Sequence, residues 1–223
     1  MSFLVVRILE DSEVRELVQQ LSRATFVDGK LTASGPAREA KNNLQAERTG
    51  PEVTAIDQIV LGALSRNQAL HSFAFARQIM LPLFNRYEKG MEYGAHVDSA
   101  VMGKGASQIR TDLSMTIFLS DPSSYDGGEL ALTSTLGEEE IKLDAGEAIV
   151  YPSTTLHRVT PVTRGVRLAA VTWIQSSVAD PQLRSILFDL HQAVELAESS
   201  GNQEMRLLLN KSYNNLLRCA IDL

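Results

Sequence analysis

The spacing at which hydrophobic residues recur along the chain changes twice. Near the N-terminus it is helical, because apolar residues recur at intervals of three and four over residues 11–24 and 53–65. The apolar positions are Val14, Leu17, Val18 and Leu21 in the first segment and Val53, Ile56, Val60 and Leu64 in the second. Asp11 and Ser12 stand where a helix is commonly capped. Stripes of this kind pack into a core far more often than they contact a cofactor, so the pattern predicts two amphipathic helices.

Residues 26–51, between these helices, show neither a helical nor a strand period. The segment is polar and rich in turn residues, with Asp28-Gly29 and Ser34-Gly35-Pro36. It also carries a polar run of Lys41, Asn42, Asn43 and Gln45. The composition is typical of a loop or a marginal helix. Such a segment could border the opening of a substrate site, but a solvated loop is the expected structure.

From about Phe73 to Ile174 the period shortens to two, as in half-buried strands. Over residues 113–120, for example, apolar residues alternate with serine and threonine. Turn signals separate the predicted strands, and they lie at Asp126-Gly127-Gly128, Asp144-Ala145-Gly146 and Arg164-Gly165. Several short strands at such spacing predict an antiparallel sandwich or barrel.

After Ser177 the helical period returns. Asp180 is placed to cap a helix and Pro181 to occupy its first turn. Gly201 then divides the segment into two apolar stripes. Their residues are Leu183, Ile186, Leu187, Leu190 and Val194 before the glycine and Met205, Leu208, Leu209, Leu216 and Leu217 after it. The chain is therefore expected to end in a helix pair, which could pack on the barrel or join two subunits.

Composition narrows the class of protein. With 223 residues, 44% of them hydrophobic, the chain can form one domain with small terminal appendages. A formal charge of −6 offers no basic field for a phosphate backbone, so nucleic acid is not an expected partner. Cys219 is the single cysteine and is expected only to pack. The apolar run from Phe3 to Val6 is too short for a signal sequence or membrane span, so a cytoplasmic protein is expected.

Four residues carry the candidate chemistry. His96 and Asp98 form a His-x-Asp pair, and two further residues of interest, His157 and Arg167, follow on predicted strands. Two imidazoles and one carboxylate are the protein ligands of a mononuclear non-haem iron(II) site, and they leave positions open for a co-substrate and dioxygen. A His-x-Asp pair alone is more often a surface or structural pair. The later histidine and arginine favour a metal site, and iron over zinc.

Arg167 lies on a strand predicted over residues 166–175. At alternate positions it shares one face with Ala169, Val171 and Trp173, which is an apolar inward face. A charge on such a face needs a bound partner, and a ligand carboxylate matches a guanidinium in a two-pronged geometry. The alternative is an arginine on the surface of the sheet, paired with an acidic residue.

A longer sequence pattern surrounds these residues. Its segments are Arg86-Tyr87-x-x-Gly90-x-x-Tyr93-x-x-His96-x-Asp98, Ser114-x-Thr116-x-Phe118-Leu119-Ser120, Gly127-Gly128-Glu129-Leu130, Gly146-Glu147-Ala148 and Pro152-Ser153-x-x-x-His157. In this order they resemble the iron(II)- and 2-oxoglutarate-dependent dioxygenases of the prolyl 4-hydroxylase type, and among these the bacterial PKHD-type hydroxylases. The resemblance extends over nearly the whole chain. Animal and plant prolyl hydroxylases usually carry lysine where this chain has Arg167, which weakens the case for proline as the substrate.

The resemblance implies an α+β protein whose core is a double-stranded β-helix, the jelly roll of cupin-like barrels. Residues 1–72 would form N-terminal helices and a loop that pack on the barrel. Residues 73–177 would form the dioxygenase domain, and residues 178–223 the C-terminal helix pair, through which a homo-oligomer could form.

The resemblance also implies roles for individual residues. His96, Asp98 and His157 would bind iron(II). Arg167 would pair with the distal carboxylate of 2-oxoglutarate, and the Tyr87 hydroxyl would bond the same co-substrate. For Tyr87 the alternative is a barrel-core residue whose hydroxyl meets a backbone group. Dioxygen would be the oxidant, and ascorbate a reductant that keeps the iron active. The substrate stays open between a peptidyl proline and a small molecule such as a siderophore.

Two other functions stay open from the sequence. A non-catalytic metal-binding sensor barrel would use the same ligands, but it would leave Arg167 without a role. A zinc hydrolase on a cupin-like barrel would need a general base. For that base Glu129 and Glu147 are the strand candidates, and each is more typical of a turn edge.

A possible rim of the site follows the glycine-containing loop of residues 103–107. Arg110, Asp112 and Ser114 alternate there, so they would share a strand face and could look toward the substrate. A solvated charged rim, in which Arg110 pairs with Asp112, is the expected arrangement.

Overall fold

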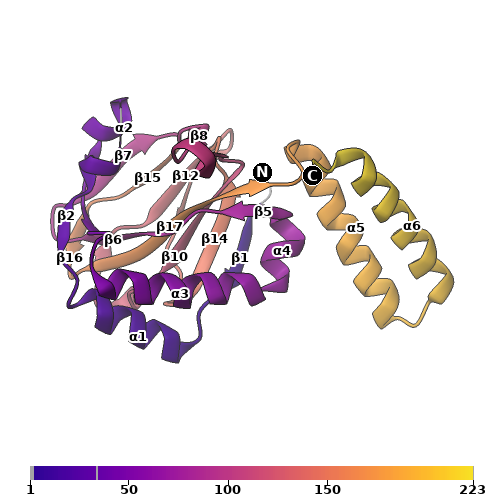
Figure 1. The fold of residues 1–223 in the computed structure, drawn as a ribbon, viewed down its shortest axis with the longest axis horizontal. Helices are drawn as coiled ribbons and strands as arrows, with labels where there is room; N and C mark the ends of the chain where they lie inside the picture. The colour runs from indigo at the N-terminus through magenta and orange to yellow at the C-terminus, as the bar shows by residue number, and fades with distance from the viewer. Residues whose placement is uncertain (1–2, 34, 223) are drawn as a thin grey trace.

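The computed structural model describes residues 3–33 and 35–222, which form two facing antiparallel sheets with helices outside the larger one (Figure 1). The larger sheet has the strand order β1-β14-β10-β17-β6-β4-β2, with β5 also paired to β17. Its strands are β1 (Leu4–Arg7), β2 (Phe26–Asp28), β4 (Leu44–Ala46), β5 (Ala76–Ile79), β6 (Leu83–Tyr87), β10 (Leu113–Phe118), β14 (Glu147–Pro152) and β17 (Arg167–Ser176).

The smaller sheet has the order β13-β12-β15-β7-β3. Its strands are β3 (Lys41–Asn42), β7 (Glu92–His96), β12 (Leu130–Ser134), β13 (Gly137–Ile141) and β15 (His157–Val159). Two short ladders complete the sheets, and their strands are β8 (Val101–Met102) with β9 (Ile109–Arg110) and β11 (Asp126–Gly127) with β16 (Val162–Arg164). The antiparallel strands predicted from the alternation are confirmed, and so is the double-stranded β-helix that the family resemblance implies.

The alternation along β10 separates two environments. Leu113, Met115 and Ile117 are buried in the main core, which the larger sheet forms with the N-terminal helices. The intervening Ser114 and Thr116 are also buried, but Ser114 contacts Asp98 and Thr116 lines a cavity. The apolar half of the strand therefore fixes the sheet on the helices, and the polar half is left for a site.

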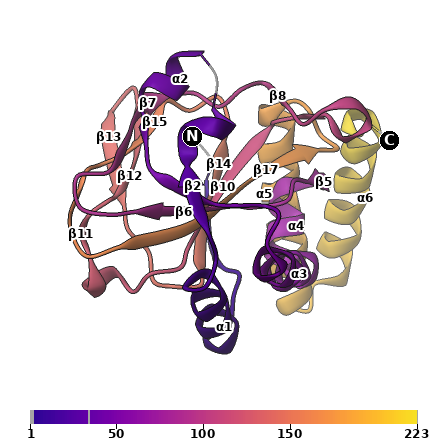
Figure 2. The same ribbon diagram turned by 60° about the vertical axis from the view of Figure 1, so that its left-hand side comes forward.

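Helices cover the outer face of the larger sheet. They are α1 (Asp11–Leu21), α3 (Pro51–Arg66) and α4 (Gln68–Ala74), and Figure 2 shows α1 and α3 on the same side of the barrel. The helix predicted over residues 53–65 is confirmed. The helix predicted over residues 11–24 ends at Leu21, and its cap is Glu10 rather than Asp11 or Ser12. The backbone N–H of Glu10 donates to the carboxylate of Glu13 at 2.9 Å, which places both expected caps inside the first turn.

The prediction of a solvated loop over residues 26–51 is wrong. This segment contains β2, β3 and β4 as well as a 3-10 helix η1 (Gly29–Thr32) and the short helix α2 (Gly35–Glu39). β3 pairs with β7 in the smaller sheet, and β4 pairs with β6 in the larger one. The strands show no apolar alternation because they are only two or three residues long, and because Lys41 of β3 and Gln45 of β4 line a cavity.

The predicted C-terminal helix pair is present as α5 (Pro181–Ser199) and α6 (Gln203–Ala220), and it extends away from the barrel in Figure 1. α5 touches α4, where the Phe188 and Phe73 rings meet edge to face at 5.2 Å. α6 contains no buried residue. Cys219 is exposed, so the expectation that it packs is wrong. Among the described residues, no helix combines the length and apolarity that crossing a membrane requires. The division of the chain at residues 72 and 177 stays a prediction.

Candidate metal centre

Strand pairing brings the two candidate histidines together. His96 is the last residue of β7 and His157 the first of β15, and they are direct cross-strand partners. The i, i+2 spacing of His96 and Asp98 would place both side chains on one face of a single strand, but Asp98 lies two residues beyond the end of β7. Its carboxylate still faces the histidines, since Asp98 Oδ2 is 3.9 Å from His157 Nε2. One ligand atom from each of the three residues lies within 4.8 Å of the others.

The same local hydrogen bond orients both imidazole rings. His96 Nδ1 donates to the Gly94 carbonyl, and His157 Nδ1 donates to the Thr155 carbonyl, each at 2.9 Å. Because a carbonyl can only accept, the proton of each neutral ring lies on Nδ1 and the lone pair on Nε2. Burial, and then the neighbouring His157, lower the pKa of His96 to about 4. His96 is therefore neutral at neutral pH, which is the form that binds a metal.

Two serines hold the candidate carboxylate ligand. Ser114 Oγ donates to Asp98 Oδ2 at 2.5 Å, and Ser153 Oγ lies 2.8 Å from Ser114 Oγ. Ser114 lies on β10 opposite Tyr151 of β14, and Ser153 directly follows the last residue of β14. Both serines stand in the sequence motifs quoted above, and Ser114 also has its alternate position after Asp112, but neither signal indicates a contact with Asp98.

Aromatic rings complete the walls around the histidines. The Tyr93 ring stacks on the His96 ring at 3.7 Å between centroids, and the Tyr151 ring meets the His157 ring edge-on at 5.3 Å. Burial raises the pKa of Tyr151 well above its ordinary value, so its hydroxyl stays protonated. No feature of the sequence points to Tyr151.

Arg167 is the largest fully buried side chain, with 1% of its surface exposed. Its guanidinium carbon lies 5.2 Å from the centre of the Tyr87 ring and 5.3 Å from that of Phe118. Among the described residues, Nε and Nη2 have no hydrogen-bond partner. Gly128 makes room for this side chain, because its φ is +68° and an added Cβ would come within 2.9 Å of Arg167 Cδ. The alternative of an ion-paired surface arginine is wrong.

Tyr87 lies directly opposite Arg167 in the pairing of β6 with β17. Its side chain is buried, and burial raises the pKa of its hydroxyl, while the charge of Arg167 and the Asn43 side chain act against that shift. The role of this hydroxyl toward the co-substrate stays a prediction. Tyr87 also lines the cavity that Arg167 faces.

All five candidate residues line one cavity of about 490 Å³. Its inner end is closed by buried residues such as Arg167, and its outer end is bordered by exposed apolar side chains. The exposed side chains are Leu81, Val97 and Val101. These five residues lie far apart in the sequence and were assigned to one site. The structure brings all five to the same cavity.

Comparison with known proteins adds an independent observation. Residues 82–175 match the family model of the 2OG-Fe(II) oxygenase superfamily. Over 212 residues, 95% of each chain, the sequence is 45% identical to a PKHD-type hydroxylase of Synechococcus sp. (strain JA-2-3B'a(2-13)). Over 220 residues, 98% of each chain, it is 42% identical to the PKHD-type hydroxylase YbiX of Escherichia coli. This chain belongs to the PKHD-type hydroxylases. It is a 2-oxoglutarate-dependent dioxygenase, and the resemblance stated from the motifs is confirmed.

The fold of this PKHD-type hydroxylase is shared with solved structures of low sequence identity. A prolyl hydroxylase from Trichoplax adhaerens, in complex with a peptide fragment of hypoxia inducible factor, superposes with a TM-score of 0.56 at 18% identity. The match covers 78% of this chain and 83% of that one. Membership of a hydroxylase family also decides against the non-catalytic sensor barrel.

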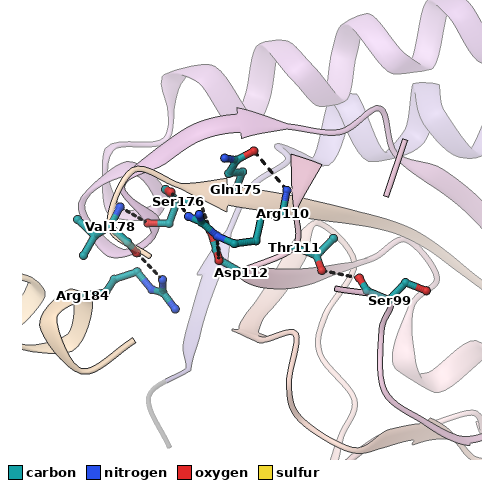
Figure 3. A network of polar contacts seen from close by, with 8 residues as sticks. All are labelled: Ser99, Arg110, Thr111, Asp112, Gln175, Ser176, Val178 and Arg184. Carbon is teal, nitrogen blue, oxygen red and sulfur yellow. Dashed lines mark hydrogen bonds and ion pairs between the residues drawn. The ribbon is translucent and has the colours of Figure 1, made fainter. Parts of the chain in front are cut away.

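Arg110 and Asp112 of this hydroxylase form the predicted pair, but only one of them is solvated. Arg110 Nε and Nη2 donate to the Asp112 carboxylate at 2.7 and 3.0 Å (Figure 3). The side chain of Asp112 is 8% exposed because its carboxylate also accepts from the backbone N–H of Ser176 at 2.8 Å. The pair therefore joins the β8–β9 hairpin to the end of β17, close to the start of α5 at Arg184 (Figure 3).

The two carboxylates considered for a zinc hydrolase lie elsewhere. Glu129 accepts a hydrogen bond from the Thr160 hydroxyl. The carboxylate oxygen Oε1 of Glu147 lies 4.0 Å from Nη2 of Arg7. Neither residue lines the cavity of the three candidate ligands. The structure offers no support for either as a general base.

Proposed function

We propose that His96, Asp98 and His157 bind the iron(II) of this dioxygenase and that Arg167 binds the distal carboxylate of 2-oxoglutarate. The observation that carries this proposal is the buried guanidinium with two unpartnered nitrogen atoms, in the same cavity as a two-histidine, one-carboxylate set. A buried charge without a partner costs several kcal/mol at least. A dianionic co-substrate, held at one end by the metal and at the other by Arg167, removes that cost.

The bound iron and 2-oxoglutarate supply the oxidation of an organic C–H group by dioxygen, with succinate and carbon dioxide as the other products. The residues of the chain hold these reactants in place. His96, Asp98 and His157 would hold the iron(II) through one ligand atom each, and a site with three protein ligands would leave the metal able to bind the co-substrate and dioxygen. Tyr87 orients the co-substrate beside Arg167.

The substrate is an organic molecule that enters from the open end of the cavity. A peptidyl proline and a small molecule such as a siderophore are the two classes that the family resemblance favours. Ascorbate is proposed as the reductant that keeps the iron active, on the strength of that resemblance alone.

A coupled assay tests the proposed function. Metal-free protein is reconstituted with iron(II), and dioxygen uptake and succinate are measured with and without 2-oxoglutarate in the absence of added substrate. We expect slow succinate formation that needs both iron(II) and 2-oxoglutarate. Succinate formation no faster than that of the Asp98→Ala protein would contradict the proposal.

The Ser114→Ala protein is expected to bind iron(II) about tenfold more weakly than the wild type, because Asp98 loses the hydrogen bond that orients it. The isosteric Ser114→Cys protein and an exposed control, Ser65→Ala, distinguish this effect from general damage to the fold. Equilibrium dialysis against a fluorescent chelator measures the affinity. An affinity of Ser114→Ala equal to that of Ser65→Ala would show that the bond is dispensable.

We also propose that the helix pair joins two copies of this chain. α6 has no buried residue, and Leu196, Met205, Leu207 and Leu208 of the pair are each more than half exposed. A twofold axis would bury these side chains against those of a second copy. A Leu207→Glu/Leu208→Glu protein is expected to have half the wild-type mass by light scattering, whereas Asn214→Glu keeps it. A monomeric wild type would refute the proposal.

A further inference from the structure

Lys41 is a buried cation on the cavity wall that the roles proposed above leave unused. It lies on β3 opposite Tyr93 of β7, and 5% of its surface is exposed. Its ammonium donates to Thr32 Oγ1 at 3.1 Å and lies 5.2 Å from the centre of the Tyr93 ring. Among the residues that the structure describes, no carboxylate comes within 4.0 Å of it. An ammonium has three donors, so one hydroxyl leaves it under-satisfied.

The charge of this lysine is retained at neutral pH. Burial lowers the pKa of Lys41 to about 8, while the negative charges of Asp98 and Asp28 act against that shift. The ammonium form therefore predominates at pH 7, in a place where a hydrocarbon side chain would fit without a desolvation cost.

The other charges of the cavity cancel once the proposed reactants are bound. The charged residues that line it are Lys41, Asp98, Arg167 and, at the exposed edge, Lys104. The charges of Asp98, Arg167, an iron(II) ion and a 2-oxoglutarate dianion sum to zero. The buried Lys41 is then left without a counter-charge inside the cavity, because Asp28, whose charge also acts on it, is exposed and does not line the cavity. Another anion in the cavity would supply one.

The position of Lys41 indicates which molecule would carry that anion. The Tyr93 ring contacts both groups, because it stacks on the His96 ring at 3.7 Å and its centre lies 5.2 Å from the Lys41 ammonium. An anion on Lys41 would therefore be one aromatic ring away from a proposed iron ligand. It would lie apart from Arg167, which is enclosed by Tyr87 and Phe118. Both ends of 2-oxoglutarate are already assigned, so the anion belongs to the substrate.

The residues that line the open part of the cavity indicate the chemistry of the rest of the substrate. Its outer wall is apolar and is formed by Leu81, Val97, Val101 and Met102. The indole N–H of Trp173, which also lines the cavity, is buried and has no acceptor among the described residues. A hydrogen-bond acceptor and an apolar body would satisfy both features.

We propose that Lys41 binds a carboxylate of the substrate, and that this hydroxylase acts on a small molecule that combines a carboxylate with an apolar body. The inference rests on the proposed function, because the charge balance includes iron(II) and 2-oxoglutarate. It favours a small carboxylic acid over a proline inside a peptide chain, whose ring carries no charge.

Calorimetry on the zinc(II)-loaded protein, saturated with 2-oxoglutarate, tests this assignment without turnover. The probes are 3-phenylpropionate and its neutral amide, 3-phenylpropanamide. We expect the wild type to bind the carboxylate at least tenfold more tightly than the amide. The Lys41→Met protein should lose this preference, and the Lys41→Arg protein should recover most of it. The control is Lys104→Met, which removes an exposed cation of the same cavity and should keep the preference within twofold.

Thermal unfolding separates this role from a structural one. The Lys41→Met protein is expected to unfold at the wild-type temperature or above it, because a buried and poorly paired charge is removed. A lower unfolding temperature, equal binding of the two probes by the wild type, or a preference that persists in Lys41→Met would overturn the assignment. Failure of the zinc-loaded wild type to bind 2-oxoglutarate would instead refute the proposed function.

Discussion

The Asp98→Ala protein is expected to bind iron(II) at least a hundredfold more weakly than the wild type and to form no succinate above background. Asp98 supplies the only carboxylate among the three proposed ligands, and burial keeps His96 neutral at neutral pH. Losing a residue that merely orients a ligand already costs roughly 10- to 100-fold in metal affinity, so losing the ligand itself costs more. Dialysis against a chelator measures the affinity, and the coupled assay measures succinate.

His71 provides a matched control for this experiment. It is exposed, and its Nε2 lies 3.1 Å from the Ser65 carbonyl, outside the cavity. A His71→Ala protein should keep the iron affinity and turnover of the wild type, whereas His96→Ala should behave like Asp98→Ala. If the iron affinity is unchanged in Asp98→Ala, these three residues do not form the metal site.

The Arg167→Ala protein should keep its iron and need roughly a hundredfold or more 2-oxoglutarate for half-maximal turnover. Two charge-assisted hydrogen bonds to a carboxylate are each worth about 1.5–3 kcal/mol, which together correspond to at least that factor. Arg167→Lys should recover part of the loss, because lysine keeps the charge without the two-pronged geometry. Succinate formation as a function of 2-oxoglutarate concentration gives the requirement.

Arg164 is the matched control for this second experiment. It lies three residues before Arg167 and forms an exposed ion pair with Asp126 at 2.6 Å. Its replacement by alanine should leave both iron affinity and the 2-oxoglutarate requirement unchanged. Loss of iron in Arg167→Ala to the same degree as in Asp98→Ala would refute the separate role assigned to the arginine.

The barrel and its main residues could be predicted because their signals are local. The alternation in β10 and the inward face of β17 are properties of single strands, and a period of two predicts them directly. The family motifs then connect His96 with His157, although only the register of β7 against β15 makes them neighbours.

The remaining parts depend on contacts that no single segment reveals. Strands of two or three residues, such as β3 and β4, are held by backbone hydrogen bonds that any side chain permits. Lys41 appeared in a loop-like run because a residue that faces a polar cavity is as hydrophilic as one that faces solvent. The bond from Ser114 to Asp98 crosses between the two sheets, so its partner could not be named before the fold was known.

The most direct test of the central claim is an anaerobic titration of metal-free protein with iron(II) and then 2-oxoglutarate, followed by visible absorption. Chelation of iron(II) by the keto acid gives a weak metal-to-ligand charge-transfer band. We expect this band only when both are present, no band in Asp98→Ala, and a band in Arg167→Ala that needs far more 2-oxoglutarate. If iron(II) is demonstrably bound to the wild type and no band appears at saturating 2-oxoglutarate, the proposed arrangement of iron and co-substrate is wrong.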